Sequence, residues 1–276
     1  MRKIVIILSV FVLIANSCGQ ATKKQMENEN DSAKVDNVTN TLDNDTITYD
    51  HFYFPIDSTF TIKVLTAGTF HSDEVWENAD KEKWFGLFQG ETGFYIAETE
   101  LTTKRVYDAV ADDNEDEATG WEVQTINKDT SMILFEKINY LTAHNVQQAI
   151  LSKEEIYPGD TLQINYLGVD YKIFATGGKK KTQDVPEWFD VWNYKLYLTA
   201  TIEGKERKSL LVAQPNFDDQ MINLIFAGDI DGDGILDLII DTSRHYNVTS
   251  PTIYLSRPAE EGEVVKPIGG HISVGC

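Results

Sequence analysis

Short runs in which apolar and polar residues alternate recur along most of the chain, and they constrain the fold more than any other feature of the sequence. In residues 161–166, for example, Leu162, Ile164 and Tyr166 would share one face of a strand. Similar runs are residues 60–65, 93–97, 132–135, 171–175, 194–202, 209–212, 221–227, 236–240, 252–255 and 264–268. Turn-forming residues separate many of these runs, so the pattern predicts an all-β fold, a sandwich or barrel of antiparallel sheets.

Helical patterning is sparse, and we expect at most one or two short helices. The best candidate is residues 72–84. Ser72 can cap its N-terminus, while Val75, Trp76 and Ala79 would lie on one face.

The composition changes near residue 51. Residues 19–50 contain few large apolar side chains and many Asn, Asp, Thr and Glu, so they cannot bury a core. We expect residues 18–50 to form a flexible tether with a reach of about 30 Å, and residues 51–276 to form the all-β domain. Residues 177–187, which are rich in Gly and Lys, are either a boundary inside this domain or one long hairpin loop.

The N-terminus has the pattern of a signal peptide. Arg2 and Lys3 precede an apolar run over residues 4–15. As a helix this run would rise only about 18 Å, which is too short for a hydrocarbon core of about 30 Å. Residues 1–17 are therefore predicted to be an export signal rather than a transmembrane helix.

The end of this segment, Ala15-Asn16-Ser17-Cys18, resembles the lipobox of bacterial lipoproteins. The resemblance implies cleavage before Cys18, a diacylglycerol on its thiol and an acyl chain such as palmitate on its new amine. It also implies a lipid anchor in the bacterial cell envelope, at the outer membrane or the periplasmic face. The alternative is an ordinary secretory signal with a cysteine near the cut by chance.

Charge and cysteine content exclude several other classes. Lys plus Arg number 24 and Asp plus Glu number 44, which gives a net charge of −20. This argues against a nucleic-acid partner, because phosphate contacts need clustered basic residues. Two cysteines cannot build a disulfide scaffold or a four-thiolate zinc site. If Cys18 carries lipid, Cys276 is either a buried small side chain or a free thiol.

The strongest chemical signal is an Asp-rich loop between two predicted strands. Its spacing is D-x-D-x-D-G-x-x-D, and the predicted metal ligands are Asp229, Asp231, Asp233, the backbone carbonyl of Ile235, and Asp237. Ca²⁺ takes six to eight oxygen ligands, and glycines allow the chain to turn tightly around it. We therefore predict one structural Ca²⁺ site, the alternative being an acidic hairpin turn without metal.

This loop resembles two known calcium loops. In an EF-hand, the twelfth position carries a bidentate Glu, but here that position is Ile240. The Asp-rich loop of FG-GAP repeats in integrin-type propellers is the closer resemblance, because it too is followed by Asp, Leu and further apolar residues. The resemblance covers about 20 residues and one loop, and it implies a propeller-style calcium hairpin in another β fold.

An aromatic cluster provides a possible ligand-binding surface. Trp188 and Trp192 are its main members, and Asp190 and Asn193 lie between or beside them. Exposed rings would suit stacking against a glycan, and a protein ligand is a second possibility. The alternative is that these rings begin a strand and belong to the core.

Two functions from different classes follow. The first is a lipid-anchored envelope protein whose calcium-stabilised β domain is a non-catalytic binding or structural module. The second is a secreted-type hydrolase acting on envelope or dietary glycans. Exposed Trp188 and Trp192 beside two carboxylates would favour the hydrolase. The sequence shows no nucleophile elbow, P-loop or zinc-protease motif, which favours the first.

Overall fold

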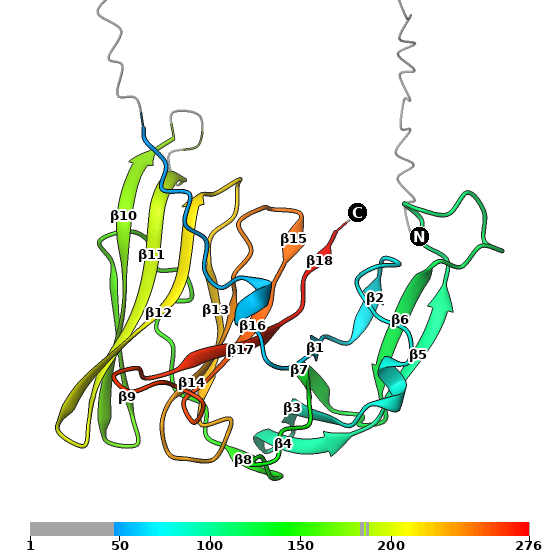
Figure 1. Cartoon of the computed structure of the whole chain (residues 1–276), viewed down its shortest axis with the longest axis horizontal. Coiled ribbons are helices and arrows are strands. Elements are labelled where there is room, and N and C mark those ends of the chain that lie inside the picture. Colours follow the sequence, from blue (N-terminus) through cyan, green and yellow to red (C-terminus); the bar gives the residue numbers. More distant parts are fainter. Residues whose placement is uncertain (1–46, 183–184, 186–187, 276) are drawn as a thin grey trace, which may run out of the picture. The chain divides into compact units, whose positions relative to one another are not determined.

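A computed structural model describes residues 47–182, 185 and 188–275. The predicted signal peptide, the lipidation site Cys18, the tether up to residue 46, and Cys276 lie outside the described residues. The described part is all-β, as predicted, and its ladders are antiparallel (Figure 1). Its helical elements are two 3₁₀ turns, η1 (Asp57–Thr59) and η2 (Ala79–Lys81). Within this part, no helix is long and apolar enough to cross a membrane.

Two four-stranded sheets form the C-terminal half of the described chain (Figure 1). The meander sheet has the order β12-β11-β10-β9 and consists of β9 (Thr161–Tyr166), β10 (Val169–Lys181), β11 (Phe189–Ile202) and β12 (Lys205–Asn216). The central sheet has the order β13-β14-β16-β17 and consists of β13 (Asn223–Gly228), β14 (Asp237–Asp241), β16 (Pro251–Leu255) and β17 (Lys266–Gly270).

The remaining strands form three smaller groups. The five-stranded sheet has the order β1-β7-β3-β4-β8 and consists of β1 (Val64–Leu65), β7 (Thr130–Glu136), β3 (Trp84–Gly90), β4 (Gly93–Thr99) and β8 (His144–Val146). The three-stranded sheet consists of β2 (Gly68–Phe70), β6 (Gly120–Thr125) and β5 (Leu101–Val106). A short pair joins β15 (Val248–Thr249) to β18 (Ser273–Val274).

The central sheet is buried on both faces. Leu238 and Ile240 of β14 belong to the core shared with the meander sheet, whereas Ile239 belongs to the core shared with the five-stranded sheet. All five residues of β14 are buried. This explains why the sequence of β14 is continuously apolar between its two aspartates and does not alternate.

The predicted helix over residues 72–84 is wrong. Only η2 is helical there, and Trp84 already begins β3. Asn78 has a left-handed backbone with φ of 66°, which interrupts any α-helix. The apolar spacing instead serves a third core, in which Val75 and Ala79 pack with Trp84 between the five-stranded and three-stranded sheets.

Residues 177–181 of the Gly- and Lys-rich segment belong to β10. Pairing of β10 with β11 runs from Tyr171 opposite Ala200 to Lys181 opposite Phe189, so this part of the segment lies in a hairpin strand.

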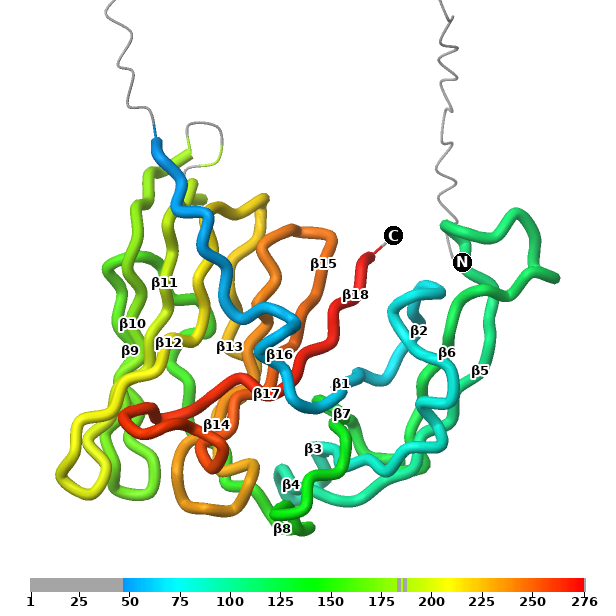
Figure 2. The backbone as a smooth tube through the Cα atoms, in the orientation of Figure 1, coloured from blue at the N-terminus to red at the C-terminus, as the bar shows by residue number. Residues whose placement is uncertain are grey.

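The described part of the chain begins at residue 47, before the predicted start of the domain at residue 51. Residues 47–50, which the tether prediction included, run beside β11 (Figure 2). The backbone amide of Asp50 donates to Asn193 Oδ1 at 2.7 Å, and Lys195 Nζ lies 3.0 Å from Asp50 Oδ2.

Candidate functional site

The Asp-rich loop joins β13 to β14, two neighbouring antiparallel strands of the central sheet. Gly228 at the end of β13 pairs with Asp237 at the start of β14, so the intervening residues must reverse direction within a short loop. Gly232 and Gly234 have φ of 75° and 85°, a left-handed conformation that glycine adopts without steric cost. The glycines therefore allow the aspartates on either side to turn toward one another.

Three of the predicted carboxylates converge. Asp229, Asp231 and Asp237 each offer an oxygen, and these three oxygens lie within 4.8 Å of one another. Asp237 is fully buried, Asp231 is 3% exposed, and Asp229 is half-buried. This buried acidic group can hold a metal ion, and we refer to it as the Asp cluster.

One oxygen of the Asp cluster lacks a hydrogen-bond partner. Asp231 Oδ2 accepts the backbone N–H of Arg257 at 3.1 Å, but the buried Oδ1 accepts no hydrogen bond. The nearest cationic group to it is Arg257 Nε at 3.9 Å, on a side chain that is 40% exposed. A buried polar atom without a partner is destabilising, so this oxygen is the one in the cluster most in need of a further partner, which a metal ion could supply.

The other two carboxylates of the cluster shape the loop. Asp237 Oδ2 accepts the backbone N–H groups of Ile230 at 2.7 Å and Asp231 at 3.0 Å. Its Oδ1 accepts the N–H of Ser256 at 2.7 Å, which ties the loop to the end of β16. The Asp229 carboxylate accepts three N–H groups at 2.7–3.0 Å, from Gly232, Asp233 and Gly234.

Asp233 and the backbone carbonyl of Ile235 are the other two predicted ligands. Asp233 is exposed and is not part of the Asp cluster. Its carboxylate accepts the N–H of Ile235 at 2.8 Å and the hydroxyl of Ser256 at 2.9 Å. The side chain of Ile235 packs against the core between the meander and central sheets.

Burial and mutual repulsion favour the protonated form of the cluster when no cation is bound. Desolvation, followed by repulsion from Asp233, raises the pKa of Asp231 to about 6. Desolvation and the neighbouring Asp231 raise the pKa of the fully buried Asp237 well above its usual range. Burial, followed by the negative charges of Asp231 and Asp237, also raises the pKa of the Tyr140 hydroxyl to about 12. Negative charge on the cluster is therefore unfavourable unless a cation balances it.

Several residues that support the loop carry no signal in the sequence. The hydroxyl of Tyr166 accepts the N–H of Asp229 at 3.0 Å, and the hydroxyl of Tyr171 accepts that of Leu236 at 3.2 Å. Ser256 and Arg257 reach the loop from beyond β16. A weak indication is that Tyr166 of β9 and Tyr171 of β10 occupy buried positions, where an apolar residue without a hydroxyl would fill the core equally well.

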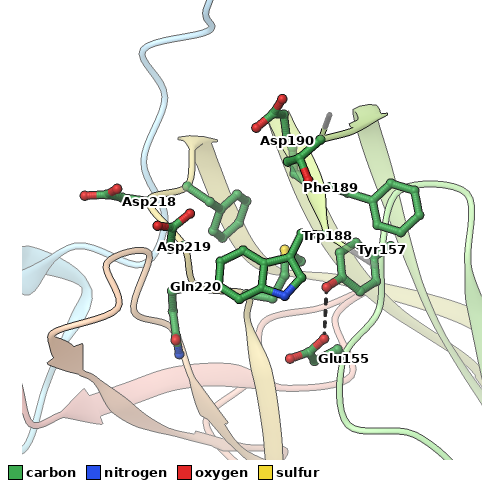
Figure 3. Close-up of a pocket in the computed structure, with 12 residues that line it drawn as sticks. Glu155, Tyr157, Trp188, Phe189, Asp190, Asp218, Asp219 and Gln220 are labelled. Carbon is green, nitrogen blue, oxygen red and sulfur yellow. Dashed lines mark hydrogen bonds between the residues drawn. The ribbon is translucent and has the colours of Figure 1, made fainter. Parts of the chain in front are cut away.

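The two tryptophans of the predicted ligand surface have different surroundings. Trp188 is 48% exposed and lines a cavity of about 530 Å³ (Figure 3). Trp192 is half-buried, does not line that cavity, and its ring covers Gly178 on the neighbouring strand so closely that no Cβ fits there. The cavity therefore includes Trp188 but not Trp192.

Comparisons with protein-family models, with curated proteins and with solved structures found no match to this chain.

The raised pKa of Asp231 predicts a pH dependence for the metal-free protein. The folded state keeps the Asp231 proton up to about pH 6, whereas an unfolded Asp releases it near pH 4. The folded state therefore binds more protons between these values, and its free energy of unfolding should fall as pH rises from about 4 to about 6. In EDTA, we expect the melting temperature of the wild type to fall over this range relative to Asp231→Asn, whose amide does not titrate.

Glu206→Gln serves as the control, because Glu206 is an exposed acid on β12. It should keep the pH dependence of the wild type. The same pH dependence in Asp231→Asn as in the wild type would contradict the electrostatic account of the cluster.

Proposed function

We propose that the Asp cluster is a structural Ca²⁺ site. The unpartnered, buried Oδ1 of Asp231, facing two further carboxylates, is the observation that carries this proposal. Only oxygen donors are present in the cluster, and hard cations such as Ca²⁺ and Mg²⁺ prefer oxygen over the nitrogen and sulfur that suit zinc. The loop spacing favours Ca²⁺, since it resembles the calcium loops of FG-GAP repeats. Mg²⁺ demands a stricter octahedral arrangement and retains several waters.

The role of the ion is to stabilise the fold. The cluster joins the end of β13 to the start of β14, and Asp237 extends this connection to the end of β16. A bound cation would offset the repulsion between carboxylates in the interior of the sheet. The central sheet would then be held at one end by the ion and along its length by its two apolar faces.

Calcium should raise the stability of the wild type by a measurable amount. A ligand at 100 times its Kd adds about 2.7 kcal/mol to the free energy of unfolding. For a domain of this size that corresponds to about 5 °C or more in melting temperature. We expect this shift between EDTA and excess Ca²⁺ for the full-length chain in a non-ionic detergent, and a smaller shift in Mg²⁺.

Matched variants make this test specific. Asp231→Asn should lose the calcium shift, while Glu206→Gln should keep it. A smaller calcium shift in Asp233→Asn than in the wild type would indicate that Asp233 also binds the ion. Identical melting of the wild type in Ca²⁺ and EDTA, with bound metal excluded by elemental analysis, would overturn the calcium proposal.

The wider function we propose is a non-catalytic binding module displayed on a lipid anchor in the bacterial envelope. The basic residues at positions 2 and 3, the short apolar run and the lipobox-like segment ending at Cys18 support the anchor. Multiple acyl chains would hold the protein firmly, whereas a single chain gives only marginal binding. The cavity beside Trp188 supports a binding role, because it offers space for a ligand and shares no residue with the Asp cluster.

The glycan hydrolase is the second candidate. One observation favours it, because Trp188 lies in a cavity that is also lined by carboxylates. Trp192, which the hydrolase hypothesis places beside Trp188, does not line that cavity. The binding module is therefore the better supported of the two.

The anchor predicts a specific effect of Cys18→Ser. This variant lacks the thiol that would carry diacylglycerol, so it should lose incorporation of labelled palmitate and leave the membrane fraction. Cys276→Ser, which changes the other cysteine, should remain labelled and membrane-bound. Membrane retention and labelling of Cys18→Ser would contradict the lipoprotein assignment and would leave the calcium proposal unaffected.

A further inference from the structure

The cavity that contains Trp188 lies where the start of β11 meets the segment between β12 and β13. Its volume is about 530 Å³, which is within the usual range for small-molecule sites. Four aromatic side chains contribute to its walls, namely Tyr157, Trp188, Phe189 and Phe217. In Figure 3 the indole of Trp188 lies between Asp219 and Tyr157, near the Tyr157–Glu155 hydrogen bond.

The aromatic walls are partly fixed in place before any ligand binds. Phe217 packs edge-on against the buried ring of Tyr194, with 5.3 Å between ring centroids. Phe189 packs against Tyr157, also at 5.3 Å. Trp188 by contrast leaves nearly half of its surface exposed. A large exposed ring beside fixed rings is typical of a site that covers part of a ligand.

The cavity is also rich in negative charge. Glu155, Asp190, Asp218 and Asp219 all line it. Glu155 accepts a hydrogen bond from the Tyr157 hydroxyl at 3.1 Å, and Asp218 lies 3.1 Å from His245 Nε2. Within the described residues, the carboxylates of Asp190 and Asp219 have neither an ion pair nor a hydrogen bond.

A basic side chain already lies near two of the rings. Lys179 Nζ is 5.4 Å from the ring centroid of Phe189 and 5.8 Å from that of Tyr157. Its charge also faces Asp160, 3.5 Å away, which does not line the cavity. Lys179 therefore offsets only part of the negative charge around these walls.

These acids are not arranged as a metal site. In the part of the chain that the structure describes, the Asp cluster is the group whose carboxylates meet closely enough to hold an ion. The carboxylates of the cavity are instead combined with aromatic faces. Aromatic faces attract cations through their quadrupole, and quaternary ammonium groups are the ligands best suited to such walls.

From this combination we infer that the Trp188 cavity binds a small organic cation with a substituted ammonium group. The alkyl groups of the cation contact Trp188 and Phe217, and its charge faces Asp219. This inference names the ligand class of the binding role proposed above, but it does not depend on the calcium site.

Choline is a suitable probe because a neutral molecule of the same shape, 3,3-dimethylbutan-1-ol, exists. The full-length chain in a non-ionic detergent with Ca²⁺ would be titrated with each compound by isothermal calorimetry. We expect saturable binding of choline, and at least about tenfold weaker binding of the neutral alcohol, because only the cation gains from the rings and carboxylates. Added salt should weaken choline binding.

Two cavity variants and a matched control assign the binding to this site. Trp188→Leu should weaken choline binding by about tenfold or more, and Asp219→Asn should weaken it several-fold. Glu206→Gln removes one exposed negative charge elsewhere and should bind choline as the wild type does. Asp219→Asn decides the question if Trp188→Leu does not fold.

Three results with choline or its neutral analogue would overturn the inference. These are no saturable binding of choline, equal affinity for the neutral alcohol, or unchanged affinity in both cavity variants. Tighter binding of a neutral oligosaccharide than of choline would also overturn it and favour the glycan alternative. Because the calcium shift in melting temperature is measured on the same samples, failure of the cavity inference is distinguishable from failure of the calcium site.

Discussion

The fold depends most on how the carboxylate of Asp237 is accommodated at the start of β14. This side chain is fully buried, and it accepts backbone N–H groups from its own loop and from Ser256 beyond β16. It thereby fixes the loop between β13 and β14 and links it to a third strand of the central sheet. Its burial beside Asp231 leaves the interior with more negative charge than Arg257 can offset at 3.9 Å. A cation between the carboxylates would resolve this conflict.

The central sheet connects the Asp cluster to the rest of the fold through its packing. Both of its faces are covered, by the meander sheet on one side and the five-stranded sheet on the other. β13 connects two chemically distinct regions, because the cavity residue Met221 precedes it and Asp229 follows it. β13 has six residues and therefore spans about 20 Å. If the Asp cluster holds the proposed ion, the ion would therefore act on the Trp188 cavity only through the sheet.

Much of the fold could be predicted from the sequence, since strands with one buried face reveal themselves by alternation. Residues 161–166 form β9 with the predicted bounds. Irregular segments escaped this reasoning. Only Val64–Leu65 of the predicted run at 60–65 is a strand, because the N–H groups of Thr61 and Ile62 both donate to the carbonyl of Ile268 and form no regular ladder. The spacing of Val75 and Ala79 looked helical, but it reflects packing against Trp84.

The Asp cluster was predictable for a similar local reason, since its members lie within nine residues and are brought together by their own turn. The contributions of Tyr166, Ser256 and Arg257 were not predictable, because they depend on which strands become neighbours. The same limitation applies to the cavity. Trp188 could be chosen from the sequence, but that it lines one cavity with Phe217 and Asp219, and without Trp192, follows only from the tertiary fold.

A crystal structure of the protein grown in excess Ca²⁺ would show whether the Asp cluster holds an ion. We predict one ion bound by carboxylate oxygens of Asp229, Asp231 and Asp237 at about 2.3–2.6 Å, with six to eight oxygen ligands in total. Asp231 Oδ1, which has no hydrogen-bond partner in the described structure, should be one of them. An Asp cluster without an ion at saturating Ca²⁺, with protonated carboxylates bonded to one another, would contradict the account.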